Sequence, residues 1–232
     1  MKDESPVPAQ TQRLASLGFM LAAVCHEVSN PLAAVSSMLQ ILQSKRGVTP
    51  QTMEKGLASI AANVARVVAI TKKLGDYSRV GGEAPGAVTI DEAVEAAATL
   101  LRHSACGRRV KVDYRGAPGV ATLARPGELE QVLLNVFLNA AQAMQGDGRI
   151  EARATRANGR IELSIRDRGP GIAPEHLGRV FDPFFTTKPP GEGTGLGLAI
   201  SYEIVQQLGG SIQAANDSRG GACFNVSLPV DP

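Results

Sequence analysis

The 232-residue chain contains no tryptophan, and aromatic residues make up only 4% of it. A surface that stacks nucleic-acid bases needs aromatic side chains, so this scarcity argues against one. Lysine and arginine together number 24 and aspartate and glutamate 22, which leaves a formal charge of +2. With so balanced a charge, the sequence gives no sign of a broad positively charged surface that would bind nucleic acid or an anionic membrane. We therefore expect no nucleic-acid partner.

Cysteine is also scarce, and long hydrophobic runs are missing. The three cysteines, Cys25, Cys106 and Cys223, are far apart and form no metal-ligand motif. This favours a reducing compartment over a disulfide framework. No run of about 18 apolar residues occurs, so we expect no membrane segment. The first ten residues lack the apolar stretch of a signal peptide, and we expect a cytoplasmic chain or the cytoplasmic portion of a larger protein.

The chain otherwise has an ordinary globular composition, with 44% hydrophobic and 20% charged residues. Its clearest interruption is VGGEAPGAV, residues 80–88, where glycine and proline replace any periodic pattern. We expect a disordered lead-in over residues 1–12, a helical domain over 13–80, a linker over 81–87 and a second domain over 88–232.

The first domain has the heptad pattern of two long helices. Mostly apolar positions recur at alternating steps of three and four residues in each helix and form a seam, the strip along which neighbouring helices pack. A turn around Gly47 and Pro50 joins the two helices. Two helices cannot bury so long a seam alone. We therefore predict that two hairpins pair into a four-helix bundle, as a homodimer. The seam positions are Leu14, Leu17, Leu21, Val24, Val28, Pro31, Val35, Met38 and Leu42, then Met53, Leu57, Ile60, Val64, Val67, Thr71, Leu74 and Ser78.

The second domain alternates short strand and helix patterns, bounded by turn residues. We expect an α+β fold, a sandwich in which helices cover one face of a mixed sheet. The expected strands are Ala87–Ile90, Val110–Tyr114, Gly148–Thr155, Arg160–Arg166, Ser211–Ala215 and Cys223–Leu228. The expected helices are Asp91–Ser104, Pro126–Met144 and Gly195–Leu208.

His26 falls at the outermost heptad position of the first helix, and Asn30 shares its solvent-facing strip. A single histidine on a helix is ordinarily a solvated surface residue. Here, however, Glu27 follows it directly and Pro31 interrupts the helix five residues later. A neutral imidazole can attack an electrophile through one ring nitrogen while a neighbouring carboxylate accepts the proton of the other. His26 is therefore also a candidate nucleophile.

The string HEVSNP, residues 26–31, resembles the H-box of two-component sensor histidine kinases. The resemblance implies that His26 is a phosphoacceptor on a dimerisation hairpin. We assign the role of its general base to Glu27. The resemblance also implies that Asn30 orients the water that removes phosphate from a partner response regulator. We hypothesise that Pro31 kinks the helix just beyond His26 and that this bend transmits the signal.

The expected helix ELEQVLLNVFLNAAQAM places Asn135 and Asn139 on one face, beside an apolar stripe. Neutral oxygen ligands suit magnesium, although two asparagines on a helix surface are also common without a ligand. The block resembles the N-box of the same kinases. This implies that Asn139 is the magnesium ligand and that Asn135 lies near the phosphates. Related ATPases that hydrolyse ATP carry glutamate at the position of Asn135, so the asparagine favours transfer to histidine.

Asp167-Arg168-Gly169-Pro170-Gly171 follows an expected strand, where a carboxylate can accept a hydrogen bond from an adenine amino group. A single DxGxG is also a common turn. The block resembles the G1 box, which implies that Asp167, Gly169 and Gly171 bind the base.

FDPFFTTK, residues 181–188, contains three of the chain's six phenylalanines and resembles the F-box, a lid over the nucleotide. Lys188 is the cation best placed by sequence for the terminal phosphates. The glycine-rich GEGTGLGL, residues 191–198, opens an expected helix, where backbone amides cradle phosphate oxygens, and it resembles the G2 box. The resemblance implies nucleotide contacts by Gly193, Thr194, Gly195, Leu196 and Gly197.

The resemblance covers nearly the whole chain. It implies that ATP, with Mg²⁺, phosphorylates His26 and that the phosphoryl group then passes to an aspartate in the receiver domain of a response regulator, with reverse phosphatase activity. An upstream sensor protein, or a sensor domain outside this chain, would supply the signal. The alternatives are an adaptor with a non-catalytic nucleotide domain and a sensor in which phosphatase activity dominates. Asn135 and the hairpin disfavour a chaperone-like ATPase.

Cys25, His103 and His176 are not assigned a role in phosphoryl transfer. Cys25 is a small filler beside the seam, with a redox switch as the alternative. His103 and His176 have no partners by spacing and are expected to be ordinary surface residues.

Overall fold

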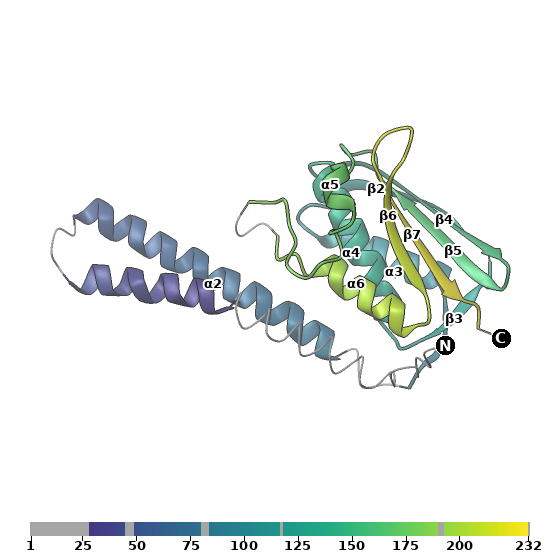
Figure 1. The fold of residues 1–232 in the computed structure, drawn as a ribbon, viewed down its shortest axis with the longest axis horizontal. Helices are drawn as coiled ribbons and strands as arrows, with labels where there is room; N and C mark the ends of the chain where they lie inside the picture. Colours follow the sequence, from purple (N-terminus) through teal and green to yellow (C-terminus); the bar gives the residue numbers. More distant parts are fainter. Residues whose placement is uncertain (1–27, 45–48, 80–83, 117, 190–192, 232) are drawn as a thin grey trace, which may run out of the picture. The chain divides into compact units, whose positions relative to one another are not determined.

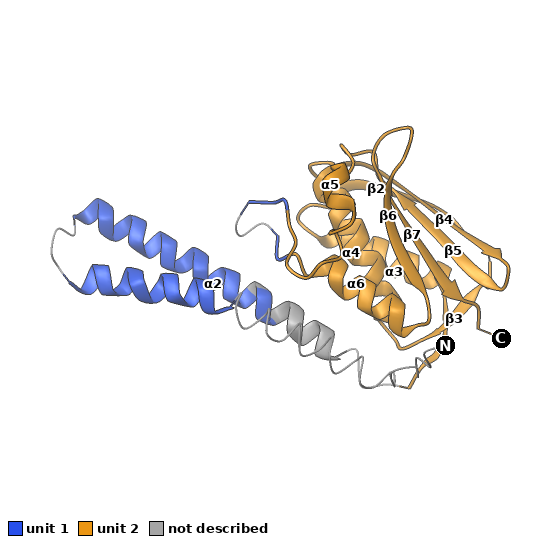
Figure 2. Ribbon diagram, viewed as in Figure 1, with its two compact units in different colours: residues 1–76, 187–194 blue, residues 77–186, 195–232 orange. Residues whose placement is uncertain are grey.

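The computed structural model describes residues 28–44, 49–79, 84–116, 118–189 and 193–231. The chain divides into two compact units, residues 1–76 with 187–194 and residues 77–186 with 195–232 (Figure 2). The expected lead-in, residues 1–12, lies outside the described residues. Of the helices in the described part, none is both long and apolar enough to span a bilayer.

The first unit contains the predicted helical hairpin. One helix occupies residues 28–43, and α2 runs from Pro50 to Arg79. Thr49 precedes α2 and accepts a hydrogen bond from the Thr52 N–H at 3.2 Å, which satisfies one of the free amides of the first turn. Pro50 follows at the first helical position, where its fixed φ suits a helix and its missing N–H costs nothing.

The first helix buries its predicted seam within the hairpin. The seam positions from residue 28 to residue 42 are buried or half-buried, and every position between them is exposed. In α2 the correspondence is only partial. Ile60 and Val67 are half-buried, whereas Met53, Leu57 and Val64 are exposed. Within the hairpin α2 has a single helical neighbour, so part of its predicted seam stays uncovered.

The second unit is a sandwich of helices on a five-stranded sheet (Figure 1). The sheet order is β2-β4-β5-β7-β6, in which β2 and β4 are parallel and all other pairs antiparallel, so the sheet is mixed, as expected. A separate antiparallel pair joins β1 to β3. The strands are β1 Gly86–Thr89, β2 Arg109–Arg115, β3 Ala121–Ala124, β4 Asp147–Ala157, β5 Arg160–Arg166, β6 Ser211–Asn216 and β7 Ala222–Pro229.

The long helices of this unit pack on one face of the sheet (Figure 1). They are α3 Ile90–His103, α4 Glu128–Ala143 and α6 Gly197–Gln207, and α5 Pro174–Leu177 is a single turn. Phe137 of α4 is fully buried and packs in one core with Ile161, Leu163 and Ile165, the alternate residues of β5. Because β5 is the middle strand of the five, the chain leaves the centre of the sheet at Arg166.

Close packing within the hairpin depends on Gly56, which α2 buries against the first helix. A Cβ at this position would lie 3.1 Å from both terminal methyl carbons of Leu42. We expect Gly56→Leu to separate the two helices and to lower the free energy of unfolding by about 1–3 kcal/mol, a typical cost of overpacking. Thermal unfolding followed by circular dichroism checks this.

The matched control is Ala58→Leu, at an exposed position of the same helix. It adds the same side chain on the opposite side of α2, so we expect little change in stability. Equal destabilisation by the two substitutions would contradict this account of the packing.

Candidate functional site

Asp167 directly follows β5 and is only 3% exposed. Its Oδ1 accepts hydrogen bonds from the backbone N–H of Gly169 at 2.8 Å and of Ala222 at 3.1 Å. Its own N–H donates to the Ala222 carbonyl at 3.0 Å. Oδ2 has no hydrogen-bond partner among the described residues. The backbone therefore orients a carboxylate whose second oxygen is left to accept a hydrogen bond from a ligand.

The loop after Asp167 leaves little room for side chains at its two glycines. A Cβ on Gly169 would lie 3.1 Å from Asp167 Oδ1 and 3.2 Å from the Cβ of Ala143. Gly171 has a φ of +81°, and a Cβ there would lie 2.8 Å from Asn216 Oδ1. Neighbouring protein atoms thus disfavour a side chain at both glycines of the DxGxG block.

Asn135 ties α4 to the first turn of α6. Its Nδ2 donates to the carbonyl of Gly197 at 2.9 Å and to Oγ of Ser201 at 3.2 Å. Ser201 is fully buried and donates to the same carbonyl at 2.9 Å. Asn139 lies one turn further along the same strip of α4 and is half-buried. The two N-box asparagines therefore line the side of α4 that meets the start of α6.

The F-box and the G2 box meet through their backbones. The N–H of Phe184 donates to the carbonyl of Gly195 at 3.0 Å, and both residues have positive φ, 66° and 64°. A Cβ on Gly195 would lie 2.2 Å from the carbonyl carbon of Phe184, so no other residue fits there. This contact joins the F-box to the segment that leads into α6.

The remaining predicted residues are distributed as follows. Leu196 is fully buried just before α6, and Gly197 begins this helix. Lys188, Gly193 and Thr194 are half-buried and belong to the other compact unit, with the hairpin. Asn30 is exposed on the first helix, whereas His26 and Glu27 lie outside the described residues.

Two known protein families match parts of this chain. Residues 16–83 match the His Kinase A (phospho-acceptor) domain, and residues 124–232 match the histidine kinase-, DNA gyrase B- and HSP90-like ATPase family. The chain belongs to the sensor histidine kinases.

Two relatives illustrate the extent of the match. The chain is 39% identical over 224 residues to the C4-dicarboxylate transport sensor protein DctB of Rhizobium meliloti (strain 1021), covering 94% of this chain and 35% of the relative. It is 32% identical over 222 residues to the sensor histidine kinase ZraS of Escherichia coli (strain K12), covering 95% and 47%. The chain thus spans less than half the length of these two relatives.

Solved structures of the same family share the fold. The mycobacterial sensor histidine kinase MprB has a TM-score of 0.56 and 29% identity, covering 64% of this chain and 99% of that one. The histidine kinase ThkA in complex with the response regulator protein TrrA has a TM-score of 0.67 and 24% identity, covering 100% and 69%.

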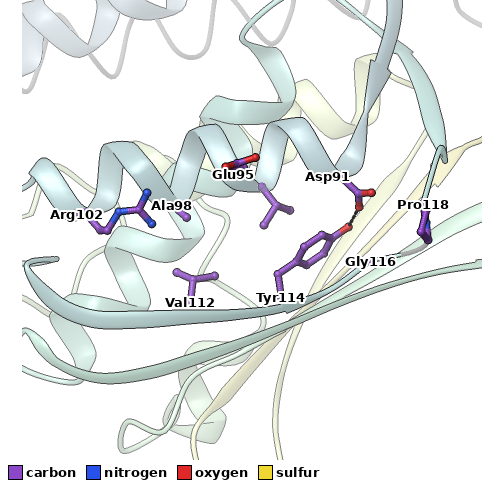
Figure 3. Close-up of a pocket in the computed structure, with 9 residues that line it drawn as sticks. Asp91, Glu95, Ala98, Arg102, Val112, Tyr114, Gly116 and Pro118 are labelled. Carbon is purple, nitrogen blue, oxygen red and sulfur yellow. Dashed lines mark hydrogen bonds between the residues drawn. The ribbon is translucent and has the colours of Figure 1, made fainter.

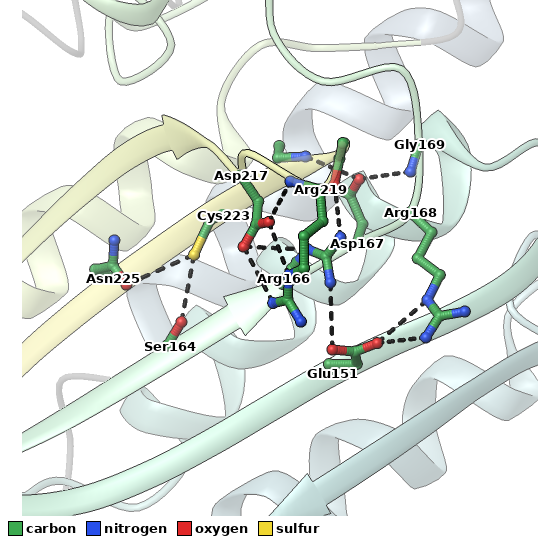
Figure 4. Close-up of polar contacts among 12 residues, drawn as sticks. Glu151, Ser164, Arg166, Asp167, Arg168, Gly169, Asp217, Arg219, Cys223 and Asn225 are labelled. Carbon is green, nitrogen blue, oxygen red and sulfur yellow. Dashed lines mark hydrogen bonds and ion pairs between the residues drawn. The ribbon is translucent and has the colours of Figure 1, made fainter.

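In this chain, Asp167 is flanked by a polar cluster that the motifs did not indicate (Figure 4). Arg166 is buried, donates to the carbonyl of Gly220 at 3.0 Å and pairs with Glu151 at 3.4 Å and Asp217 at 3.3 Å. The cluster links β4, the end of β5 and the β6–β7 turn. Its charges are dispersed along the sequence over 69 residues, 151–219, so no local pattern marks them as a group.

Arginines set the protonation of the two carboxylates in this cluster. The Arg219 guanidinium and backbone N–H hydrogen-bond to Asp217 and lower the pKa of its carboxyl to about 2. Arg168 donates to Glu151 at 2.6 Å and likewise holds the pKa of that carboxyl below its usual value. Both groups are therefore ionised throughout the neutral range.

A separate cavity of about 450 Å³ lies between α3 and β2 (Figure 3). The Tyr114 hydroxyl donates to Asp91 Oδ1 at 2.6 Å, and burial together with this bond raises the pKa of the phenol. No motif residue lines the cavity, and its lining falls between the two family matches. The lining residues are Asp91, Val94, Glu95, Ala98, Arg102, Val112, Tyr114, Gly116 and Pro118.

The two described histidines differ. His103 is exposed, as expected, and its Nδ1 lies 2.8 Å from the carbonyl of Thr99. The interpretation of His176 as an ordinary surface residue is wrong. It is half-buried and meets the ring of Phe185 edge-on at 5.3 Å between centroids. The sequence gives no sign of this pairing because the contact is made across the irregular segment after α5. Cys106 and Cys223 are free thiols, and Cys25 lies outside the described residues.

The lowered pKa of Asp217 predicts a specific acid response. The unfolded pKa of an aspartate is about 3.9. A group with a depressed folded pKa stabilises the protein fully above its unfolded pKa and loses this effect as the pH falls through the folded value. The melting temperature of the parent should therefore exceed that of D217N by a constant margin above about pH 5, and the margin should shrink as the pH falls from about 4 toward 2.

The control is D147N, which removes a carboxylate that is 69% exposed and lies 3.8 Å from Arg109. It should leave the melting temperature nearly unchanged at every pH. A margin for D217N that does not vary with pH would contradict the assignment.

Proposed function

We propose that this chain binds ATP in the sandwich unit and transfers the terminal phosphoryl group to His26, from which it passes to an aspartate of a response regulator. The observation that carries the proposal is the buried Asp167 carboxylate, with Oδ1 held by two backbone amides and Oδ2 left without a partner among the described residues. It occurs in a chain whose residues 16–83 match a phospho-acceptor domain.

The base-binding end is assigned to the loop of Asp167, Gly169 and Gly171. An ionised carboxylate accepts a hydrogen bond from an exocyclic amino group, and such charge-assisted bonds are among the stronger ones in proteins. Adenine carries this amino group. Gly169 keeps a side chain out of the space beside the carboxylate.

The phosphate end is assigned to the start of α6. The N-terminus of an 11-residue helix carries a partial positive charge and directs N–H groups outward, which favours phosphate oxygens. Gly195, Leu196 and Gly197 supply this backbone, and Asn135 holds its first turn. Lys188, Gly193 and Thr194 are proposed as further phosphate contacts from the G2 and F boxes.

Magnesium fits the donor set of this site. Among the described residues, no three His, Cys, Asp or Glu side chains form a group that could hold a metal by themselves. Mg²⁺ is commonly held by one or two protein oxygens together with phosphates and waters, and Asn139 offers one amide oxygen. When bound, the metal neutralises charge on the phosphates.

The transfer step uses residues of the H-box. A ring nitrogen of His26 attacks the terminal phosphorus, the bond from this phosphorus to the bridging oxygen breaks, and ADP leaves with that oxygen. Glu27 accepts the proton from the other ring nitrogen. Asn30 orients water for the reverse, dephosphorylating reaction on the response regulator.

The partners follow from the hairpin and from a relative. The apolar residues that the hairpin leaves exposed would be covered by a second copy in a four-helix bundle, which supports a homodimer. The structure of ThkA in complex with the response regulator TrrA supports a receiver domain as the acceptor. An upstream sensor would supply the signal, and the cytoplasm is the proposed location. The exposed hairpin residues are Leu32, Leu39, Ile41, Met53, Leu57, Val64 and Val68.

We expect H26A to reduce labelling by γ-³²P-ATP to background while the affinity for ATP stays unchanged, because the nucleophile and the nucleotide site are separate. D167A should reduce both labelling and affinity. Labelling is measured by autoradiography and affinity by isothermal titration calorimetry.

The control H103A removes an exposed histidine outside the motifs and should label like the parent. Undiminished labelling of H26A would overturn the assignment of the phosphoacceptor. Parent protein that binds ATP without any labelling would instead favour the adaptor alternative.

N139A should raise the magnesium concentration required for half-maximal labelling by about tenfold, since loss of one oxygen ligand weakens the metal site. A magnesium titration at saturating ATP measures it. N225A, at an exposed position on β7, is the control. An unchanged magnesium requirement in N139A would remove Asn139 from the metal site.

A further inference from the structure

The β6–β7 turn, taken here with the strand residues that flank it as residues 216–222, packs against the loop after Asp167 and belongs to none of the motifs found in the sequence. We propose that Asn216 is a positioning residue of the nucleotide site, which holds residues 167–172 in the conformation that presents Asp167 Oδ2 to the adenine amino group. This proposal rests on the function proposed above and adds a determinant of base selectivity to it.

Asn216 binds the far end of the loop with both groups of its side-chain amide. Its Nδ2 donates to the carbonyl of Ile172 at 2.7 Å, and its Oδ1 accepts from the N–H of Ile172 at 2.7 Å. This pair of bonds has the pattern of a strand ladder, with a side chain in place of a partner strand. It fixes both polar backbone groups of one loop residue at once.

The same side chain explains why the loop needs glycine at position 171. A Cβ on Gly171 would lie 2.8 Å from Asn216 Oδ1 and 3.3 Å from its Cγ. The positive φ of Gly171, +81°, turns the chain toward the amide. Asn216 and Gly171 therefore act as a pair, in which the side chain occupies the space that the glycine leaves.

The other end of the turn holds Asp167 itself. The N–H of Ala222 donates to Asp167 Oδ1, and a Cβ on Gly221 would lie 2.1 Å from the Asp167 carbonyl oxygen. Within the turn, the N–H of Asp217 donates to the carbonyl of Gly221 at 3.0 Å. One short turn thus contacts the loop at its beginning, through Ala222, and at its end, through Asn216.

Arg166, at the end of β5, also contacts the same turn. It donates to the carbonyl of Gly220 and pairs with Asp217, so the turn is anchored to the central strand independently of Asn216 (Figure 4). Loss of the Asn216 side chain should therefore leave the turn in place. It should free the loop at Ile172 and make the position of Asp167 Oδ2 less defined.

Base selectivity is the property that isolates this role. Adenine presents an amino donor to Asp167, whereas the base of inosine carries at that position an oxygen acceptor, which cannot donate to a carboxylate. A loop that no longer orients Asp167 should lose affinity for ATP more than for inosine 5′-triphosphate. A general loss of structure would lower the affinity for both nucleotides by the same factor.

The experiment is calorimetric titration of the parent, N216A, D167A and the D167A/N216A double variant with ATP and with inosine 5′-triphosphate. We expect N216A to weaken ATP binding by about tenfold, the worth of one hydrogen bond to a charged group, and to change inosine triphosphate binding less than about threefold. In the D167A background, N216A should have almost no further effect on either nucleotide, because the two residues act through one contact.

The control N225A removes an exposed asparagine of the adjacent strand and should bind both nucleotides like the parent. Parent-like ATP affinity in N216A overturns the proposal. Equal losses for both nucleotides, or additive losses in the double variant, overturn it as well, because Asn216 is then only structural. If the parent itself does not bind ATP, the proposed function fails, a result distinct from these.

Discussion

A buried carboxylate at the end of the central strand is the constraint on which the second unit's candidate site depends. An unpaired charge inside a protein is costly, so its oxygens must be met by donors. Here backbone amides of Gly169 and Ala222 meet one oxygen of Asp167. Those amides belong to two different segments, the loop after β5 and the start of β7. The carboxylate can therefore stay buried only while both segments keep their positions.

Glycine and asparagine residues around the carboxylate keep these two segments in position. Gly169, Gly171 and Gly221 let backbone pass where a Cβ would collide, and Asn216 fills the space beside Gly171. Asn135 plays a comparable part at the start of α6. Polar side chains bound to the backbone thus hold both ends of the proposed nucleotide site. The hairpin differs, because apolar positions such as Leu57 and Val68 are exposed in the described part of the chain.

Much of the architecture could be predicted from local patterns. Heptad spacing located the hairpin and the buried face of its first helix, and alternation located six of the seven strands, with β5 at Arg160–Arg166 as expected. The four-residue strand β3 and the single turn of α5 were missed, because so few residues carry little periodicity, although β1, of the same length as β3, was expected. The face of α2 was only partly predicted, because a heptad does not say which positions meet a neighbour within the chain and which meet another hairpin.

The candidate site could be proposed from the sequence where its residues are neighbours in the chain, as in the four blocks that resemble nucleotide boxes. It was not predictable where it depends on contacts between distant residues, such as Asn216 with Ile172 or Arg166 with Gly220. Such bonds join backbone atoms to side chains 44 or 54 residues away. Nothing in an asparagine or an arginine read alone identifies its distant backbone partner.

The central claim is that Asp167 recognises the adenine of ATP. A crystal structure of the protein with a non-hydrolysable ATP analogue and magnesium tests it most directly. We predict that the adenine amino nitrogen lies within about 3.2 Å of Asp167 Oδ2, while Oδ1 keeps its bonds to Gly169 and Ala222. An adenine bound elsewhere, for example in the cavity between α3 and β2, would contradict the account.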